Sequence, residues 1–227
     1  MLGMVGVTGF VLLAVISGFL FFLTVPKKSA DAPTAVTAPQ PNASVNPQNN
    51  SDVILGHLAY PEALETELVS ISADGRIKMR SAAAEKFQAM VQAARSAGVS
   101  LVPLSAFRSI KDQEKLFFDV GAQRNQTPAE RAALSAPPGH SEHHTGYAVD
   151  IGDGAAAGTN VIETFDTTKA YQWLQANAAR FSFEMSFPKD NVQGVSYEPW
   201  HWRFVGDRDS LETFYRAKNL KPVQPKQ

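Results

Sequence analysis

The pattern of apolar and polar residues divides the chain into parts of different character. Residues 3–25 are apolar and carry no charge, whereas residues 26–52 are rich in Pro, Ala, Asn, Ser and Gln and contain no aromatic residue. From residue 53 onward, apolar positions recur at helical and strand spacings. We therefore expect one folded domain over residues 53–220, followed by a flexible tail at residues 221–227.

The clearest helix is expected at residues 81–97. Phe87, Met90 and Ala94 recur there at the spacing of one helix face, and Gly98 follows as a C-cap. Residues 99–107 are expected to form a strand in which Pro103 marks an edge or an irregularity. Further helices are expected at residues 110–123, 127–134, 167–180 and 207–219, and further strands at residues 147–151, 181–187 and 200–205. This mixture predicts the α+β class, with helices packed around a small, mostly antiparallel sheet.

The N-terminal segments predict an attachment to a membrane. A helix needs about 20 predominantly apolar residues to cross a bilayer, and residues 3–25 meet that length. We predict a transmembrane anchor, or an uncleaved signal sequence, at residues 1–25. A secretory signal peptide is the competing interpretation, because Ala30-Asp31-Ala32 has the A-x-A cleavage pattern, but the apolar segment is longer than that of a typical signal peptide. Residues 26–52 cannot bury enough apolar surface to offset the entropy of ordering them, so we expect a disordered tether.

Composition limits the chemistry that the domain can perform. The formal net charge is −1, which argues against nucleic acid as a partner. The chain has no cysteine, so a metal site must use His, Asp or Glu side chains. The helical zinc-protease motif H-E-x-x-H and the hydrolase motif G-x-S-x-G are both absent.

The histidines suggest a metal site built from distant segments. His143 and Asp150 lie in "SEHHTGYAVD", residues 141–150, where Gly146 allows the chain to fold back so that the two side chains meet. His201 lies in "YEPWHWRFVG", residues 197–206, on the strand face opposite the neighbouring tryptophans. These residues also have simpler interpretations, as a hydrogen-bonded loop pair and a core histidine.

Three motifs carry a resemblance to a known family. Residues 141–150 resemble the Ser-x-His-x-x-Gly-x-Ala-x-Asp signature of the D-Ala-D-Ala metallopeptidases, a superfamily shared with lysostaphin-type enzymes and the amino-terminal domain of hedgehog proteins. "EPWHWR" at residues 198–203 resembles the second signature, and "SAFRSIKDQ" at residues 105–113 resembles the substrate-binding strand-to-helix turn. The order of the motifs is most similar to vancomycin-resistance-type D,D-carboxypeptidases and implies the hedgehog/D,D-peptidase-like zinc fold.

The resemblance implies a zinc site with three protein ligands. The ligands would be His143, Asp150 and His201, with water in the fourth position. His143 rather than His144 is the ligand in this comparison, because it stands two residues after Ser141 in the signature.

The resemblance also implies catalytic and substrate-binding residues. Glu198 would be the general base, and Pro199 breaks the strand so that Glu198 can turn toward the metal. Arg108 would bind a carboxylate or the developing oxyanion. Gln113 and Ser141 would form hydrogen bonds with the substrate.

The function that follows is a zinc-dependent D-alanyl-D-alanine carboxypeptidase that uses metal-activated water to remove the terminal D-Ala from peptidoglycan stem peptides. An L,D-carboxypeptidase, a D-Ala-D-Ala dipeptidase or a peptidoglycan endopeptidase on the same fold remain alternatives. A zinc-stabilised wall-binding module without catalysis is the alternative from another class, but such a module has no use for a base at Glu198.

This function predicts a monomer with an extracytoplasmic catalytic domain on a membrane anchor. Lys27 and Lys28 conflict with that orientation, because the positive-inside rule places such residues in the cytoplasm. We expect His140 and His144 near the pocket rim, and the sequence assigns no role to His57.

Overall fold

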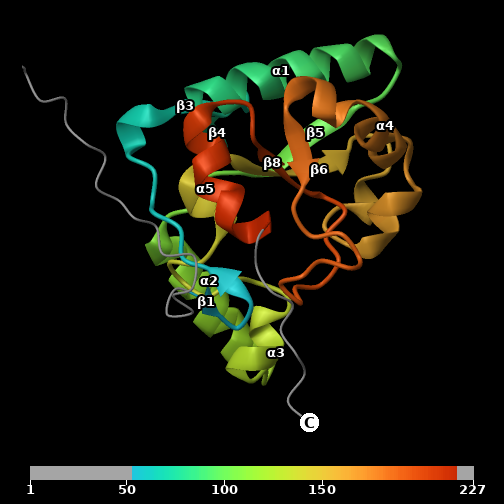
Figure 1. Cartoon of the computed structure of the whole chain (residues 1–227). Helices are drawn as coiled ribbons and strands as arrows, with labels where there is room; N and C mark the ends of the chain where they lie inside the picture. The colour runs from blue at the N-terminus through green and yellow to red at the C-terminus, as the bar shows by residue number, and fades with distance from the viewer. Residues whose placement is uncertain (1–52, 219–227) are drawn as a thin grey trace, which may run out of the picture. The chain divides into compact units, whose positions relative to one another are not determined.

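The computed structural model describes residues 53–218 (Figure 1). The predicted anchor at residues 1–25, the predicted tether at residues 26–52 and the predicted tail at residues 221–227 lie outside the described residues. Within residues 53–218, no helix is both long enough and apolar enough to cross a bilayer.

Short strands and helices alternate along the described chain. The strands are β1 (Val53–Ile54), β2 (His57–Leu58), β3 (Leu68–Ser70), β4 (Lys78–Arg80), β5 (Leu101–Ser105), β6 (Ala148–Asp153), β7 (Phe183–Met185) and β8 (His201–Phe204). The α-helices are α1 (Ser81–Ser96), α2 (Ile110–Gln123), α3 (Pro128–Ala132), α4 (Lys169–Asn177) and α5 (Arg208–Lys218). Short 3-10 helices lie between them, among them η3 (Glu142–Thr145) and η6 (Ala178–Phe181).

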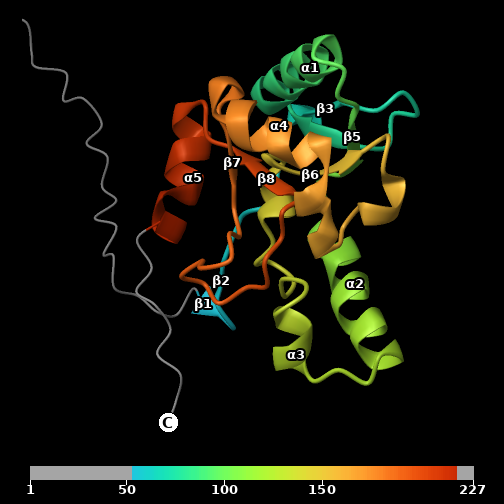
Figure 2. The same ribbon diagram turned by 90° about the vertical axis from the view of Figure 1, so that its right-hand side faces the viewer.

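The central sheet has four strands in the order β5-β6-β8-β7, and every neighbouring pair is antiparallel. β6 is therefore an inner strand between β5 and β8, which Figure 2 shows beneath α1 and α4. This confirms the predicted α+β class. The hairpins β1-β2 and β3-β4 were not predicted, because strands of two or three residues carry no readable alternation.

Most predicted elements are confirmed with small changes at their ends. α2 has the predicted bounds, and Thr127 caps α3 through a capping box with Glu130. The predicted helix at residues 167–180 is wrong at its C-terminal end. The α-helix α4 ends at Asn177, and the next residues form the 3-10 helix η6. Ser182 then adopts a positive φ of 63°, which ends the helix and directs the chain into β7.

The two faces of β6 have different roles, as the strand alternation predicts. Tyr147, Val149 and Ile151 join the hydrophobic core, whereas Asp150 belongs to the opposite face. Pro103 lies in the edge strand β5, whose register against β6 shifts between Pro103 and Ser105. The core therefore holds one face of β6 firmly and fixes the direction of Asp150 on the other.

Candidate active site

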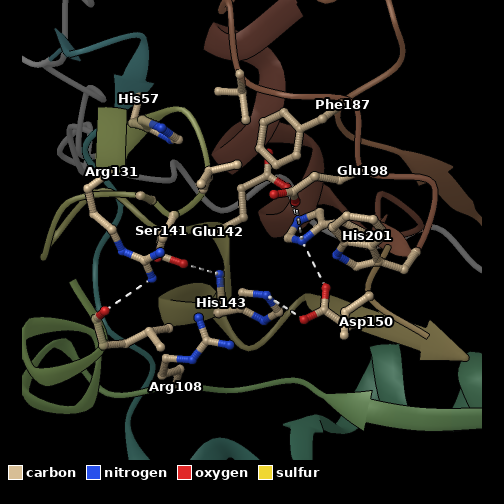
Figure 3. A pocket seen from close by; sticks show the side chains of 17 residues that line it. His57, Arg108, Arg131, Ser141, Glu142, His143, Asp150, Phe187, Glu198 and His201 are labelled. Atoms are coloured by element: carbon tan, nitrogen blue, oxygen red, sulfur yellow. Dashed lines mark hydrogen bonds and ion pairs between the residues drawn. The ribbon is translucent and has the colours of Figure 1, made fainter. Parts of the chain in front are cut away.

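A pocket of about 260 Å³ opens beside the face of β6 and β8 that carries Asp150 and His201. That volume is close to the lower end for small-molecule sites, so the pocket suits the end of a small peptide rather than a long polymer segment. Figure 3 shows Arg108 and Arg131 on one side of the pocket, and Asp150, Glu198 and His201 on the other. The two sides of the pocket therefore differ in charge.

The predicted ligands His143, Asp150 and His201 meet in this pocket. His143 Nε2 lies 3.3 Å from Asp150 Oδ2, and His201 Nδ1 lies 3.1 Å from Asp150 Oδ1. One possible ligand atom from each residue lies within 4.8 Å of the others, and all three side chains are buried. Two nitrogens and a carboxylate oxygen that converge in this way fit a zinc ion.

Two local features of the chain produce this convergence. Gly146 has a φ of 71° and ends η3, so the chain reverses between His143 and Asp150. A Cβ at this position would lie 2.9 Å from Leu68 Cδ2, so a larger residue would displace its neighbours. Asp150 is the direct cross-strand partner of His201 in the β6-β8 ladder, which brings the two motifs together.

The outer nitrogens of both histidines are occupied, which orients the inner nitrogens toward the site. His143 Nδ1 donates a hydrogen bond to the Ala106 carbonyl oxygen at 2.7 Å. His201 Nε2 donates to Glu142 Oε2 at 2.9 Å. Such partners fix the tautomer and the ring orientation of a ligating histidine. The lone pairs of His143 Nε2 and His201 Nδ1 therefore remain available to bind a metal.

Glu142 is a functional residue that the sequence analysis missed. Its side chain is buried and accepts hydrogen bonds from His201, from Ser186 Oγ at 2.5 Å and from Arg203 Nη1 at 2.6 Å. Burial acts to raise the pKa of Glu142, but Arg203 and the hydrogen bonds from His201 and Ser186 outweigh it and hold the pKa at about 2. Arg203 was the available signal, because it lies two residues after His201 in the same strand and therefore on the same face, where a charged residue needs a carboxylate partner.

Glu198 lies beside the three residues, as the break at Pro199 predicts. The His201 backbone N–H donates to the Glu198 carbonyl oxygen at 3.1 Å, which closes a turn. Glu198 Oε2 then lies 3.7 Å from His201 Nδ1. Burial, followed by smaller effects that include repulsion from Asp150 and Glu142, raises the pKa of Glu198 to about 7. This value suits a group that accepts and returns a proton near neutral pH.

The raised pKa of Glu198 predicts a pH dependence of stability in protein freed of metal with a chelator. Between about pH 4.5 and pH 7 the unfolded chain loses the Glu198 proton while the native state keeps it, so unfolding becomes easier as pH rises. A difference of about 2.5 pKa units corresponds to about 3 kcal/mol. Metal-free Glu198→Gln should therefore be more stable than wild type at pH 8 by up to about this amount.

Urea unfolding of both chelator-treated proteins at pH 5 and pH 8 measures this difference. At pH 5 the two free energies of unfolding should nearly agree, because native Glu198 is then neutral like Gln. An equal difference at both pH values would contradict the prediction.

Arg108 and Gln113 form one unit at the pocket wall. Arg108 Nη1 donates to Gln113 Oε1 at 2.8 Å, and Arg108 Nη2 donates to Ser105 Oγ at 2.9 Å. The Gln113 amide nitrogen donates in turn to the Ala136 carbonyl oxygen at 2.6 Å and to Ser135 Oγ at 3.0 Å. Gln113 is fully buried and does not line the pocket, so its contacts orient Arg108. The predicted hydrogen bond between Gln113 and the substrate would require Gln113 to release one of its present hydrogen-bond partners.

Ser141 lines the pocket and caps η3, where its Oγ accepts a hydrogen bond from the His143 backbone N–H at 3.3 Å. Its hydroxyl proton can still be donated to a ligand.

The remaining histidines have structural contacts. His144 is fully buried, contrary to the expected position at the rim, because Nδ1 donates to the Arg108 carbonyl oxygen and Nε2 accepts from the Gly139 N–H. His140 is half-buried and its Nδ1 lies 3.0 Å from the Pro138 carbonyl oxygen. His57 lines the pocket and its Nε2 lies 2.8 Å from the Ala132 carbonyl oxygen, a position that nothing in the sequence indicated.

Comparison with known proteins gives a consistent set of relatives. The sequence profile of the VanY D-alanyl-D-alanine carboxypeptidases matches residues 76–207. The Bacillus subtilis protein YodJ is 32% identical over 173 residues, and a D-alanyl-D-alanine carboxypeptidase of Enterococcus faecalis is 32% identical over 171 residues. These alignments cover 72% and 71% of this chain. They span only 62% and 60% of the two relatives.

Solved structures share the fold. The LD-carboxypeptidase LdcB is 30% identical, with a TM-score of 0.56 and coverage of 71% of this chain and 76% of that chain. VanYB in complex with D-alanine-D-alanine is 29% identical, with a TM-score of 0.54 and coverage of 72% and 90%. A vancomycin-resistance D,D-pentapeptidase VanY in complex with Zn(II) is 27% identical, with a TM-score of 0.52 and coverage of 68% and 88%.

Proposed function

This chain belongs to the VanY family of D-alanyl-D-alanine carboxypeptidases, and we propose that it is a zinc-dependent enzyme that removes the terminal D-Ala from peptidoglycan stem peptides. The observation that carries the proposal is the convergence of His143, Asp150 and His201 with Glu198, whose carboxylate lies 3.7 Å from His201 Nδ1. A wall-binding module would need the three ligands but not the buried carboxylate beside them.

The residues of the chain have separate tasks in this reaction. His143, Asp150 and His201 would hold a zinc ion, which when bound would supply Lewis acidity that lowers the pKa of the attacking water and polarises the scissile carbonyl. Glu198 takes the proton of that water and then gives it to the leaving amine nitrogen. Arg108, which Gln113 and Ser105 orient, donates hydrogen bonds to the oxygen that gains negative charge.

Product analysis tests the proposal most directly. The full chain, purified in detergent with zinc, should remove one alanine from a stem pentapeptide that ends in D-Ala-D-Ala, and mass spectrometry of the products measures this. The reaction should stop after a chelator is added and resume when zinc is restored. Release of a dipeptide, or no reaction at all, would contradict the proposed activity.

The similarity to LdcB favours a second candidate activity on the same site, the L,D-carboxypeptidase reaction. A tetrapeptide that ends in a single D-Ala separates the two activities, because only the L,D reaction shortens it. We expect the pentapeptide to be the better substrate.

We place the catalytic domain outside the cytoplasm, on the anchor predicted at residues 1–25. The apolar sequence of residues 3–25 and a wall substrate support this location, whereas Lys27 and Lys28 count against it. Digestion of the domain by protease added to intact cells, after the wall is permeabilised, would support it. His143, Asp150, His201 and Glu198 of the same chain meet in one pocket, so we propose that a monomer is sufficient for activity.

A further inference from the structure

Val161 combines an unusual backbone conformation with an exposed apolar side chain. It lies in the connection between β6 and α4, and its φ of 53° places it in the left-handed region. This region is unfavourable for a β-branched residue, because the side chain crowds the backbone. Val161 is nevertheless 51% exposed, so burial of its side chain does little to offset the strain. A glycine or an asparagine would fit the same turn with less strain.

The residues on both sides of Val161 hold it in this conformation. Asn160 Oδ1 accepts a hydrogen bond from the Asp153 backbone N–H at 3.0 Å. The Asn160 amide also packs against Gly152 on β6, where a Cβ would lie 2.6 Å from Asn160 Oδ1. On the other side, the Phe165 side chain is fully buried in the core. Strained residues persist where their surroundings are fixed in this way, and they are concentrated at functional sites.

Val161 lies at the mouth of the active-site pocket. It lines the pocket together with Leu134, which follows α3 and is 49% exposed. The three metal-ligand residues that line the same pocket are buried. The two half-exposed side chains therefore lie where the pocket opens to solvent. The next residue along the chain, Ile162, is 48% exposed but does not line the pocket.

The mouth of the pocket faces the part of a peptide substrate that the pocket itself does not hold. A cavity of about 260 Å³ takes the end of a small peptide. A carboxypeptidase holds the scissile bond at the metal, so the residues that precede the terminal two lead outward. In a stem peptide the residue before D-Ala-D-Ala is a diamino acid, whose side chain has an aliphatic stem and a polar end. Apolar groups at the mouth match the stem and leave the polar end in water.

We propose that Val161, together with Leu134, binds the aliphatic stem of the residue that precedes D-Ala-D-Ala and thereby favours peptides with a long side chain at that position. The assignment rests on the proposed function. The fixed left-handed backbone holds the Val161 methyl groups at the mouth before the substrate arrives, which reduces the entropy lost on binding. A contact so far from the reacting bond stabilises the bound substrate and the transition state equally, so it acts on KM rather than on kcat.

Three N-acetylated tripeptides test the assignment with the full chain, purified in detergent and loaded with zinc. All of them end in D-Ala-D-Ala, and they begin with L-lysine, L-norleucine or L-alanine. Val161→Asn keeps a residue that tolerates the left-handed region but replaces the two methyl groups by a polar amide. It should raise KM for the lysine and norleucine peptides by about 5- to 20-fold, the effect of losing burial of about two methylene groups, and leave kcat unchanged. KM for the alanine peptide should change by less than about twofold.

Stability separates a binding role of Val161 from a structural one. Because Asn adopts a positive φ more readily than Val, the Tm of Val161→Asn should equal or exceed that of the wild type. Val161→Ile keeps a branched apolar side chain and should retain the preference for the lysine and norleucine peptides. Ile162→Asn is the matched control, because it changes the neighbouring exposed side chain outside the pocket lining. Its KM should stay within about twofold of the wild type for all three peptides.

An equal rise in KM for all three peptides, or no rise for any of them, would overturn the assignment. A rise for the lysine peptide alone would show contact with its ammonium group instead of its stem, and a lower Tm of Val161→Asn would assign Val161 to the fold. Failure of the wild type to cleave any of the peptides would contradict the proposed function. In that case calorimetry still tests the inference, because Val161→Asn should weaken binding of the norleucine peptide and leave binding of the alanine peptide unchanged.

Discussion

Glu198→Gln should lower kcat by about 10²- to 10⁴-fold, the usual contribution of a positioned general base, while its zinc content stays at the wild-type level. The carboxylate lies 3.7 Å from His201 Nδ1 and holds its place through backbone bonds that a Gln would keep. Gln has nearly the same volume, but its amide cannot take a proton from water. The loss should therefore appear in kcat rather than in metal binding.

Steady-state D-Ala release and metal analysis on the same preparation measure these two quantities. Glu184→Gln is a matched control, because it changes a carboxylate that contacts Arg203 on β8 and lies outside the pocket lining. It should retain kcat within about threefold, as expected of a substitution away from the reacting groups. A Glu198→Gln protein with wild-type kcat would exclude Glu198 as the base, and one without zinc would indicate that Glu198 supports the metal site.

Glu142→Ala should weaken zinc binding by about 10- to 100-fold, because it removes the group that orients His201. The same change should destabilise the fold by about 3–5 kcal/mol, since Arg203 loses the buried carboxylate 2.6 Å from its Nη1. Competition with a chromophoric chelator measures the first effect, and urea unfolding measures the second. The two effects arise from different contacts of one side chain.

A second substitution separates those two contacts. Glu142→Ala combined with Arg203→Met removes both buried charges and should recover much of the unfolding free energy. It should not recover zinc affinity, because His201 Nε2 still lacks its acceptor. If the double variant bound zinc like the wild type, the loss in Glu142→Ala would be a consequence of instability alone.

The Glu198 side chain affects both the stability of the metal-free protein and its expected activity. The burial that raises the pKa of Glu198 to about 7 also makes its ionised form unfavourable in the metal-free protein. Glu198→Gln is thus expected to be the more stable protein at pH 8 and the less active one. A buried charged side chain at an active site often lowers the stability of the protein while it supports activity.

The sequence alone determined the class of the fold, most element positions and the three metal-ligand candidates. Apolar spacing is a local property, so α1, α2 and the core face of β6 could be read from neighbouring residues. The metal-ligand candidates His143, Asp150 and His201 followed from the resemblance of two short motifs to the signatures of a known family. Gly146 and Pro199 marked the turns that bring these side chains together.

Only the tertiary structure decided which residues support the ligands. Glu142 stands next to His143 in the chain, yet its partners His201 and Arg203 lie 59 and 61 positions away. Arg131 reads as an ordinary helix-surface cation until α2 and α3 bury it in the pocket wall. The energy of a buried charge depends on which groups surround it in space. That information appears when distant segments pack together, and a local pattern of residues does not contain it.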